Sequence, residues 1–532
     1  MNPWRCARAR VDTLNPGFDP ISTNGKQLAP RERADLLVVG AGVAGCAAAL
    51  EAARAGLRVI LVDEHPVDAS AMGLDVPLHF GGRAGGIVRN RGAMFEAMAA
   101  NNPALGEAFE AGVDIRLGVA VWSLVSRRPG TGWVGGSAAG LTDGEACWFC
   151  AYDAAILATG RRDVGVAFPR WELPGVMGAA AAYSLLHRYD ALEGSAFVIL
   201  GSGLEATALA EGLRAAGRKV AALVEAESGA IDPAGCARLA ASGVQVFVGR
   251  MIGRALGRDS VEGATIVALD GRAPEVTIAC DTIVLATGAA PAIELFDVAG
   301  AEIVFRPESG GHVPLVDGEG RTSVPMLFGA GDCLGVNPAG GVAAEGVRAA
   351  RAAASALASG AAWHAPAKPA PSAQATSPRL AWARAVAAVA DADTHVCQCE
   401  EVTLADLLGV QPPRYLNSDR PAQRARDLAT LAAEGPIVQD QVKRLTRAGM
   451  GACQGRRCRE QIGALLAQAS GAPLSAMPPP SYRAPVRPLP LSAFADEAED
   501  AAIADHWAVW FGIESQWVPF WTPLATDEEG RR

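Results

Sequence analysis

The sequence predicts an α/β protein that contains two dinucleotide-binding folds and a smaller module near its C-terminal end. Two glycine-rich turns, GAGVAG at Gly40–Gly45 and GSGLEA at Gly201–Ala206, each follow an apolar segment and precede an alanine-rich one. A strand, a glycine turn, a helix and a second strand form a βαβ unit, from which doubly wound sheets are built. Four cysteines follow in two short pairs, in VCQCEE and GACQGRRC.

Composition limits the classes of protein and partner. A chain of 532 residues, half of them hydrophobic and a fifth charged, is long enough for about three domains. The net charge is −10 and no block of Lys or Arg stands out, so nucleic acid and anionic lipid are not expected partners. No run of roughly eighteen apolar residues occurs, so no transmembrane segment is expected. Eleven cysteines, an odd number, argue against a disulfide framework and predict a reducing compartment, the cytoplasm.

The first glycine turn is expected to bind the pyrophosphate of a dinucleotide. Gly40 makes the tight turn, Gly42 lets the backbone approach the phosphates, and Gly45 allows the helix to pack closely on the strand. The helix N-terminus then offers free N–H groups and the positive end of its dipole. The second strand ends 23 residues after Gly40 at Asp63-Glu64, where a carboxylate can bind ribose hydroxyls, and Asp63 is preferred because it follows four apolar residues. The alternative is a turn that packs well and binds nothing.

A later segment, LFGAGDCLGV, favours FAD over NAD as the first dinucleotide. It resembles the second FAD motif of the glutathione-reductase-like flavoproteins, in which a Gly-Asp pair ends a strand and a helix follows. The resemblance implies that Asp332, after Gly331, bonds the ribityl chain, and that a helix start near Gly340–Gly341 faces the flavin pyrimidine. The ATG segment that ends at Gly160 is assigned to the same cofactor site. The alternative for Asp332 is a simple helix cap.

The second glycine turn predicts a further nucleotide site. Gly201 and Gly203 take the equivalent positions, and Glu225 ends the following strand, where an acidic residue favours an unphosphorylated ribose. NAD or another adenine nucleotide is therefore expected in preference to NADP. The alternative is a duplicated domain that has kept its fold and lost its ligand. From Ala34 to Ala358 the order of segments resembles the flavoproteins with two dinucleotide domains, which implies that the second domain is inserted into the first.

The pair Cys147 and Cys150, in CWFC, invites comparison with the redox disulfide of thioredoxin reductases. The pair lies in an extended segment, where residues three apart point to opposite faces, and a redox CxxC usually begins a helix. Both are therefore expected to be ordinary buried cysteines. No catalytic acid, base or nucleophile is recognisable, so the catalytic residues stay unassigned.

The four later cysteines predict a site held by thiolates. Cys397 and Cys399 flank one residue, 53 residues follow, and Cys453 and Cys458 flank four. Four thiolates hold zinc or an iron–sulfur cluster, and a C-x-C pair is unusual for zinc. VCQCEEVT and KRLTRAGMGACQGRRC resemble the bacterioferritin-associated-ferredoxin type of domain, which implies a small helical domain with a [2Fe-2S] cluster on these ligands. About twenty extra residues, QPPRYLNSDRPAQRARDLAT, lengthen the segment between the pairs, which an external loop can absorb.

The whole order of segments resembles the alpha subunits of heteromeric opine oxidases, sarcosine oxidases and proline dehydrogenases, and the B subunit of hydrogen cyanide synthase. RDVGVAFPRWELPGVMGA at Arg162–Ala179 is similar to their PGW-x-LPGVM segment, with Arg170 in place of Gly. Two features depart from this pattern. The early GGQ is missing, with GGRAGG at Gly81–Gly86 as its candidate replacement, and the folate-using domains of sarcosine oxidase have no counterpart in these residues.

The resemblance implies electron transfer within a hetero-oligomer. A catalytic beta flavoprotein subunit would oxidise the C–N bond of an amine or of an N-substituted or secondary amino acid, and this chain would relay the electrons through FAD and cluster. A further small iron–sulfur subunit is a second expected partner. The alternatives are an autonomous NAD(P)H-dependent FAD reductase, in which NADH alone bleaches the flavin, and a redox-silent scaffold, which is colourless.

The expected domain boundaries follow from these motifs and from changes in composition. In chain order they are an N-terminal arm 1–33, the FAD-binding domain 34–165 and 289–358, the inserted dinucleotide-binding domain 166–288, a linker 359–393, the [2Fe-2S] domain 394–470 and a tail 471–532. The tail is rich first in proline and then in aromatic residues, namely Trp507, Trp510, Phe511, Trp517, Phe520 and Trp521. Such aromatic density suits either a partner interface or a strap on the chain's own domains.

Overall fold

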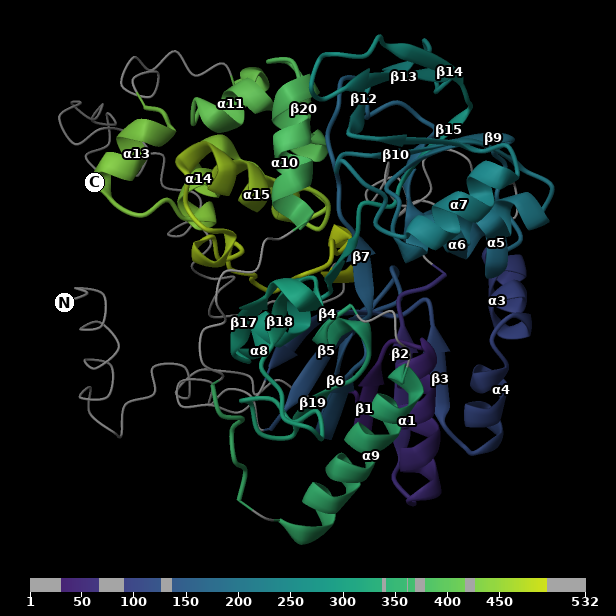
Figure 1. The fold of residues 1–532 in the computed structure, drawn as a ribbon. Coiled ribbons are helices and arrows are strands. Elements are labelled where there is room, and N and C mark those ends of the chain that lie inside the picture. The colour runs from purple at the N-terminus through teal and green to yellow at the C-terminus, as the bar shows by residue number, and fades with distance from the viewer. Residues whose placement is uncertain are drawn as a thin grey trace, which may run out of the picture.

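The structure is a computed structural model that describes residues 30–66, 90–125, 136–336, 341–360, 362–368, 378–416 and 426–494. Gly81–Gly86, Gly340 and the aromatic residues of the tail lie outside these ranges. Figure 1 shows two α/β units and a third group of helices, drawn green to yellow, that lies beside both. Within the described ranges, no helix combines the length and the apolar character needed to cross a bilayer.

The first α/β unit is built on a seven-stranded sheet. Its strand order is β3–β2–β1–β6–β5–β4, and β19 also pairs with β6. Strands β1, β2, β3, β6 and β19 are parallel, while β4, β5 and β6 form an antiparallel meander. The strands are β1 (Glu32–Val39), β2 (Val59–Asp63), β3 (Asp114–Leu117), β4 (Ala120–Val125), β5 (Ala138–Thr142), β6 (Cys147–Leu157) and β19 (Leu327–Gly329).

Both faces of this sheet are buried, which explains why the second half of β1, Leu36–Val39, is wholly apolar. Successive residues of a strand point to opposite faces, so Leu36 and Val38 enter one core and Leu37 and Val39 the other. The first core is covered by α1 and α9, and the second by β4, β5 and α8. The helices are α1 (Val43–Arg54), α3 (Arg91–Ala100), α4 (Pro103–Glu110), α8 (Glu294–Ala299) and α9 (Val342–Ser359).

The second α/β unit has a five-stranded parallel sheet of order β11–β10–β9–β15–β8. Helices α5, α6 and α7 cover one face, and a three-stranded antiparallel sheet lies against the other (Figure 1). The parallel strands are β8 (Val176–Gly178), β9 (Ala196–Leu200), β10 (Lys219–Glu225), β11 (Gln245–Val248) and β15 (Thr282–Leu285). The other elements are α5 (Ala179–His187), α6 (Leu204–Ala215), α7 (Pro233–Ala241), β12 (Arg250–Leu256), β13 (Gly263–Ala268) and β14 (Val276–Ala279).

Two short strands carry the chain between the units. It leaves the first unit along β7 (Arg161–Asp163) and returns along β16 (Ala289–Pro291), and these strands pair with each other antiparallel. A hairpin of β17 (Ile303–Arg306) and β18 (Gly311–Pro314) follows, with 3-10 turns at Pro307–Ser309 and Asp332–Leu334. The second unit therefore lies between two segments of the first.

The C-terminal part is mainly helical, and its core continues into that of the second unit. Its elements are α10 (Pro378–Val389), β20 (His395–Cys397), β21 (Val402–Thr403), α11 (Leu404–Leu408), α13 (Leu428–Glu434), α14 (Gln439–Thr446) and α15 (Arg459–Ser470). Short 3-10 turns lie at Gln398–Glu400, Arg414–Leu416, Leu474–Ala476 and Leu491–Phe494. We refer to residues 394–470 as the cysteine module.

Two expected boundaries differ from the structure. Strand β1 begins at Glu32, inside the predicted arm, because Glu32 and Arg33 already pair with Cys150 and Ala151 of β6. The predicted linker 359–393 contains helix α10, which buries Trp382 against α15. An Ala-rich composition is compatible with a linker and with a helix. Here the segment forms helix α10 because one of its faces is buried.

Candidate cofactor sites

The first glycine turn has the geometry that a dinucleotide requires. Gly40 has φ +106°, and a Cβ there would overlap the carbonyl oxygen of Ala158, so only glycine fits. A Cβ at Gly45 would likewise overlap the carbonyl oxygen of Gly40, which shows how closely α1 packs on this turn. At Gly42, by contrast, an added Cβ meets no described atom within 4 Å. The turn is therefore tightly packed at Gly40 and Gly45 and open at Gly42, as a phosphate-binding loop must be.

The N-terminus of α1 is available to an anion. Among the described residues, no side chain caps Gly42, and the first turn of α1 contains no acidic residue. Val43 begins the helix and is 64% exposed although it is apolar. A bound dinucleotide would cover Val43 and accept hydrogen bonds from the free N–H groups, so these residues fit the predicted cofactor.

Asp63 and Glu64 have different partners. Asp63 Oδ2 accepts a hydrogen bond of 2.6 Å from the N–H of Ala41, and Oδ1 accepts from the N–H and Nδ1 of His65 at 2.7 and 3.0 Å. Burial opposes the charge of Asp63, but the hydrogen bond and charge of His65 hold its pKa below the ordinary value. Glu64 instead binds Arg487, whose Nε lies 2.5 Å from Glu64 Oε2. Asp63 thus contacts the glycine turn and Glu64 does not.

Gly331 and Asp332 lie at the carboxyl end of β19, beside the first glycine turn. Gly331 has φ +83°, and a Cβ there would lie 3.0 Å from the side chain of Ala44 in α1. Burial raises the pKa of Asp332, and Arg161, whose Nε lies 3.3 Å from Asp332 Oδ2, lowers it. Gly160 immediately precedes Arg161, with φ +68° and open space above it. The predicted flavin contacts at Gly160, Gly331 and Asp332 therefore gather at one edge of the sheet.

The second glycine turn repeats the first in outline. Gly201 has φ +121°, and a Cβ there would overlap the carbonyl oxygen of Ala286, while Gly203 is the N-cap of α6 as Gly42 is of α1. Leu204, the counterpart of Val43, is 59% exposed. Glu225 is buried, and its carboxylate accepts hydrogen bonds from the hydroxyl of Ser202 at 2.7 Å and the N–H of Glu227 at 3.1 Å. The Glu225 carboxylate therefore stabilises the turn through these hydrogen bonds, and burial raises the pKa of Glu225.

Arg161 joins the two nucleotide sites. Besides Asp332 it binds Glu205, in the first turn of α6, with Nη2 and Oε1 2.9 Å apart. Asp163 lies beside Glu205, and both of its carboxylate oxygens accept from the N–H of Ala180 at 3.0 Å. Burial and then the charge of Glu205 raise the pKa of Asp163 to about 7. This bridge crosses the space between the carboxyl ends of the two sheets, where dinucleotides bind.

Cys147 and Cys150 lie on strand β6, as predicted. Cys150 is fully buried in the core, and burial raises its pKa to about 12. Burial also raises the pKa of Cys147. Neither cysteine has the lowered pKa that a redox CxxC at a helix N-terminus requires.

The structure brings the four predicted ligand cysteines together. Cys397 ends β20, Cys399 lies in the following 3-10 turn, and Cys458 directly precedes α15. The sulfur atoms of Cys399 and Cys453 are 3.5 Å apart. Cys397 and Cys453 each interact with the thiols of Cys399 and Cys458, so the four sulfurs form a closed ring of contacts. Hydrogen bonds from the thiols of Cys399 and Cys458 lower the pKa of Cys397 and of Cys453.

The backbone around this ring suits a group held by thiolates. The N–H of Gly449 points at the sulfur of Cys397 over 3.4 Å, and a Cβ at Gly451 would lie 2.7 Å from the sulfur of Cys399. Cys399 is exposed, whereas the other three are buried. Over the residues that the structure describes, no three His, Cys, Asp or Glu side chains have the geometry to hold a single metal ion. The donor set is one of four thiols in contact, a set that suits a cluster.

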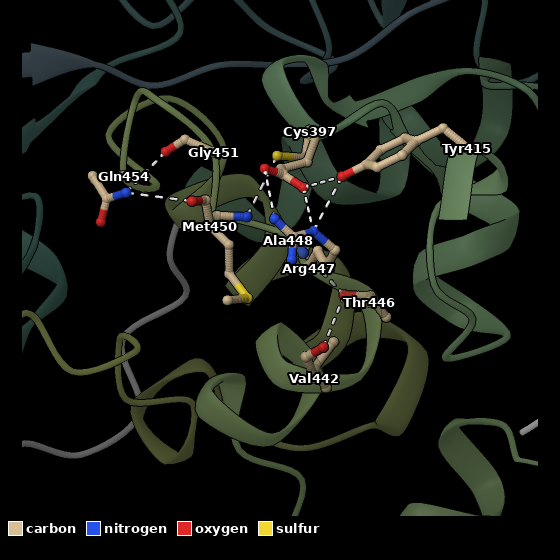
Figure 2. A network of polar contacts seen from close by, with 11 residues as sticks. Cys397, Tyr415, Val442, Thr446, Arg447, Ala448, Met450, Gly451 and Gln454 are labelled. Atoms are coloured by element: carbon tan, nitrogen blue, oxygen red, sulfur yellow. Dashed lines mark hydrogen bonds and ion pairs between the residues drawn. The ribbon is translucent and has the colours of Figure 1, made fainter. Parts of the chain in front are cut away.

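A polar network supports the loop beside Cys399. Glu400 accepts hydrogen bonds from the Tyr415 hydroxyl at 2.5 Å and from Arg447 Nε at 2.7 Å. Figure 2 shows Arg447 and Tyr415 near Cys397, with Met450 and Gly451 next to them. Glu400 is buried, so its charge needs these partners. The network holds the CQCE turn against the loop that carries Gly451.

The cysteine module is attached to the segment that follows Gly160. Trp171 Nε1 donates to the carbonyl oxygen of His395 at 2.7 Å, and the N–H of Ala167 donates to Gln461 Oε1 at 3.0 Å. A Cβ at Gly165 would lie 2.9 Å from the carbonyl oxygen of Arg457. The backbone between Cys453 and Cys458 therefore lies directly against the chain that leaves the flavin-type fold.

Arg161, Asp163 and Arg487 are site residues that sequence reasoning did not identify. Arg161 follows Gly160 directly, so its place after the ATG motif was the available signal. Arg487 lies in a proline-rich segment far along the chain from Glu64, and no local pattern relates the two.

Comparison with known proteins identifies the family. The family model described as pyridine nucleotide-disulphide oxidoreductase matches residues 34–358, more than half of the chain. The chain belongs to this family. As a pyridine nucleotide-disulphide oxidoreductase it has the FAD-dependent oxidoreductase fold, which confirms the predicted α/β architecture and supports FAD as a cofactor.

Named relatives of this pyridine nucleotide-disulphide oxidoreductase match most of its length. An opine oxidase subunit of Agrobacterium tumefaciens (strain Ach5) is 28% identical over 506 residues, which cover 87% of this chain and 91% of the relative. Hydrogen cyanide synthase subunit HcnB of Pseudomonas aeruginosa is 27% identical over 510 residues, covering 87% and 99%. Among solved structures, L-proline dehydrogenase from P. horikoshii has a TM-score of 0.56 at 19% identity, covering 86% of this chain and 79% of that one, a likeness of fold. The predicted resemblance to these proteins is confirmed.

Proposed function

We propose that this chain is the electron-transfer subunit of a heteromeric oxidoreductase that oxidises the C–N bond of an amine or of an N-substituted or secondary amino acid. The relatives named as oxidase or synthase subunits support the assembly, and the opine and sarcosine in the names of the oxidases indicate the substrate class. In the proposal a catalytic beta flavoprotein subunit removes the electrons from the substrate. A further small iron–sulfur subunit is a second proposed partner.

The observation that carries the proposal is the ring of four cysteine sulfurs on a module that packs against the flavin-type fold. We infer a [2Fe-2S] cluster on Cys397, Cys399, Cys453 and Cys458, the thiolates that such a cluster requires. When bound, the FAD and the cluster would allow electrons to be transferred both in pairs and one at a time. The chain's own residues have simpler tasks: the first glycine turn binds phosphate, and Asp332 orients the ribityl chain.

The Arg161 bridge favours this role over that of an NAD(P)H-dependent reductase. A nicotinamide that extends from the second glycine turn to the flavin would have to cross the space that Arg161 occupies between Glu205 and Asp332. The second site therefore suits NAD or another adenine nucleotide that does not exchange hydride with the flavin. None of the ten described cysteines forms a disulfide, which supports a reducing compartment, the cytoplasm, as its location.

The test is to purify the complex anaerobically through this chain. We expect FAD, iron and acid-labile sulfide in near-stoichiometric amounts, and dye reduction by a panel of secondary and N-substituted amino acids only when the partner subunit is present. NADH alone should leave the flavin oxidised. Rapid amine oxidation by the isolated chain, flavin bleaching by NADH, or a preparation with neither iron nor sulfide would each contradict the proposal.

A further inference from the structure

The segment after the cysteine module crosses back to the first α/β unit. We call residues 478–490 the C-terminal strap. Its Ser481 hydroxyl donates to Asp440 of α14 at 2.9 Å, so the strap starts on the cysteine module. The next N–H, of Tyr482, donates to Asp297 of α8 at 2.8 Å, so one residue later the strap contacts the first unit.

The middle of the strap is packed as firmly as a core element. The side chain of Val486 is 1% exposed and lies among the apolar residues of β4, β5 and β6. Its N–H donates to the carbonyl oxygen of Trp122 in β4 at 2.9 Å. A buried valine contributes about 1.5–3 kcal/mol of apolar transfer energy, so this attachment has appreciable strength. The strap therefore has a defined position on the first unit.

Near its C-terminal end, the strap contacts Glu64, the residue that directly follows β2. Arg487 follows Val486, and its Nε and Nη2 lie 2.5 and 3.3 Å from the two carboxylate oxygens of Glu64. The Arg487 side chain is largely buried, and it is the largest charge partner that opposes the desolvation of Glu64. Arg456, between Cys453 and Cys458, acts on the same carboxylate in the same direction. Two cations from the C-terminal part thus face one acidic residue of the first unit.

Glu64 is the neighbour in sequence of a residue that contacts the first glycine turn. It directly follows Asp63, whose carboxylate binds the N–H of Ala41 inside the first glycine turn. Without a countercharge, this carboxylate would repel the pyrophosphate that the turn is shaped to hold. Arg487 removes that repulsion.

We propose that Arg487 is a positioning residue for the flavin dinucleotide, which it serves by neutralising Glu64, so that the C-terminal strap makes FAD retention depend on the folded cysteine module. The inference rests on FAD binding at the first glycine turn, part of the proposed function, and is independent of a cluster on the cysteines. It assigns a role in cofactor binding to a segment outside residues 34–358, the range that the family model matches.

The sign of the charge effect provides the test. In the full chain, FAD affinity of the apoflavoprotein is measured by quenching of flavin fluorescence for Arg487→Ala, Glu64→Gln and the double variant. Arg487→Ala should raise the Kd about tenfold, because it removes the main countercharge of Glu64. Glu64→Gln should leave the Kd unchanged or lower it, and the double variant should return to within about threefold of the parent. Arg487→Lys should retain most of the affinity because it keeps the charge.

Arg483→Ala is the matched control, since Arg483 is an exposed arginine of the same strap. It should leave the Kd unchanged, because the charge of Arg483 is not paired with Glu64 in the structure. Equal losses of affinity in both single variants and in the double variant would mean that the pair only ties the strap down, and would overturn the inference. A parent chain that binds no FAD would overturn the proposed function itself. An Arg487→Ala variant that binds FAD as tightly as the parent would overturn this inference alone.

Discussion

Gly451 is the position at which a single methyl group tests the cysteine site most directly. In Gly451→Ala the new Cβ would lie 2.7 Å from the sulfur of Cys399 and 3.0 Å from Cγ of Glu400. Favourable contact between such atoms begins near 3.5 Å, so the sulfur has to move by roughly 1 Å. A free thiol can do this by rotating about its own bond. A thiolate that holds a cluster cannot, because three other ligands fix its position.

The expected effect of Gly451→Ala therefore falls on the bound group and only weakly on the fold. Overpacking of this size costs about 1–3 kcal/mol, which corresponds to a roughly fivefold to 150-fold weaker hold on the cluster. Iron and acid-labile sulfide per chain should fall sharply, while the free energy of unfolding of the cluster-free protein changes by about 1 kcal/mol or less. Both are measured on anaerobic preparations, the second by chemical denaturation.

Gly435→Ala is the control for this experiment. Gly435 lies in the same module, has an extended backbone with φ 161°, and a Cβ there meets no described atom within 4 Å. It should keep the parent content of iron and sulfide. If Gly451→Ala keeps that content as well, Cys399 does not hold a cluster in the position that the structure gives it.

Three further predictions concern the two dinucleotide folds. Gly42→Ala should leave the free energy of unfolding within about 1 kcal/mol of the parent and weaken FAD binding, whereas Gly45→Ala should cost at least about 2 kcal/mol in the same denaturation assay, because its Cβ overlaps a carbonyl oxygen. The folded pKa of Asp163 is about 7, so the folded chain keeps a proton that the unfolded chain loses near pH 4, and stability should fall as pH rises from about 4 to 7, by at most about 4 kcal/mol. Asp163→Asn should abolish this fall, and an unchanged pH profile would disprove the assignment. Cys147→Ser should retain flavin content and dye reduction in the assembled complex, which a redox role for the CWFC pair would forbid.

The parts of the fold that sequence predicts well are those governed by neighbours along the chain. The spacing of Gly40, Gly42 and Gly45 between apolar segments predicts a tight turn before a helix, and the positive φ of Gly40 and the close approach at Gly45 are its physical cause. The order of motifs predicts the family fold because each motif ends a strand of a parallel sheet. Those strand ends then lie on one edge, which brings Gly160 and Asp332 together.

The contacts that sequence cannot predict join residues with no common pattern. Arg161 binds Asp332 of one unit and Glu205 of the other, which requires the mutual orientation of two folded sheets. Arg487 meets Glu64 only because the strap crosses from the cysteine module to β2. The convergence of the four cysteines was predictable from resemblance alone, since 53 intervening residues allow many other arrangements.

One short segment links the flavin-type fold to the cysteine ring. Gly160 lies at the predicted flavin edge, and eleven residues later Trp171 donates a hydrogen bond to the carbonyl oxygen of His395, two residues before Cys397. Trp171 is 1% exposed, and Gly165 in between admits no side chain because the backbone of Arg457 lies against it. A buried, hydrogen-bonded connection of this kind holds two sites at a fixed separation, which the proposed electron transfer between them would require. The same packing explains why this segment contains the tryptophan and small residues that made the family resemblance visible.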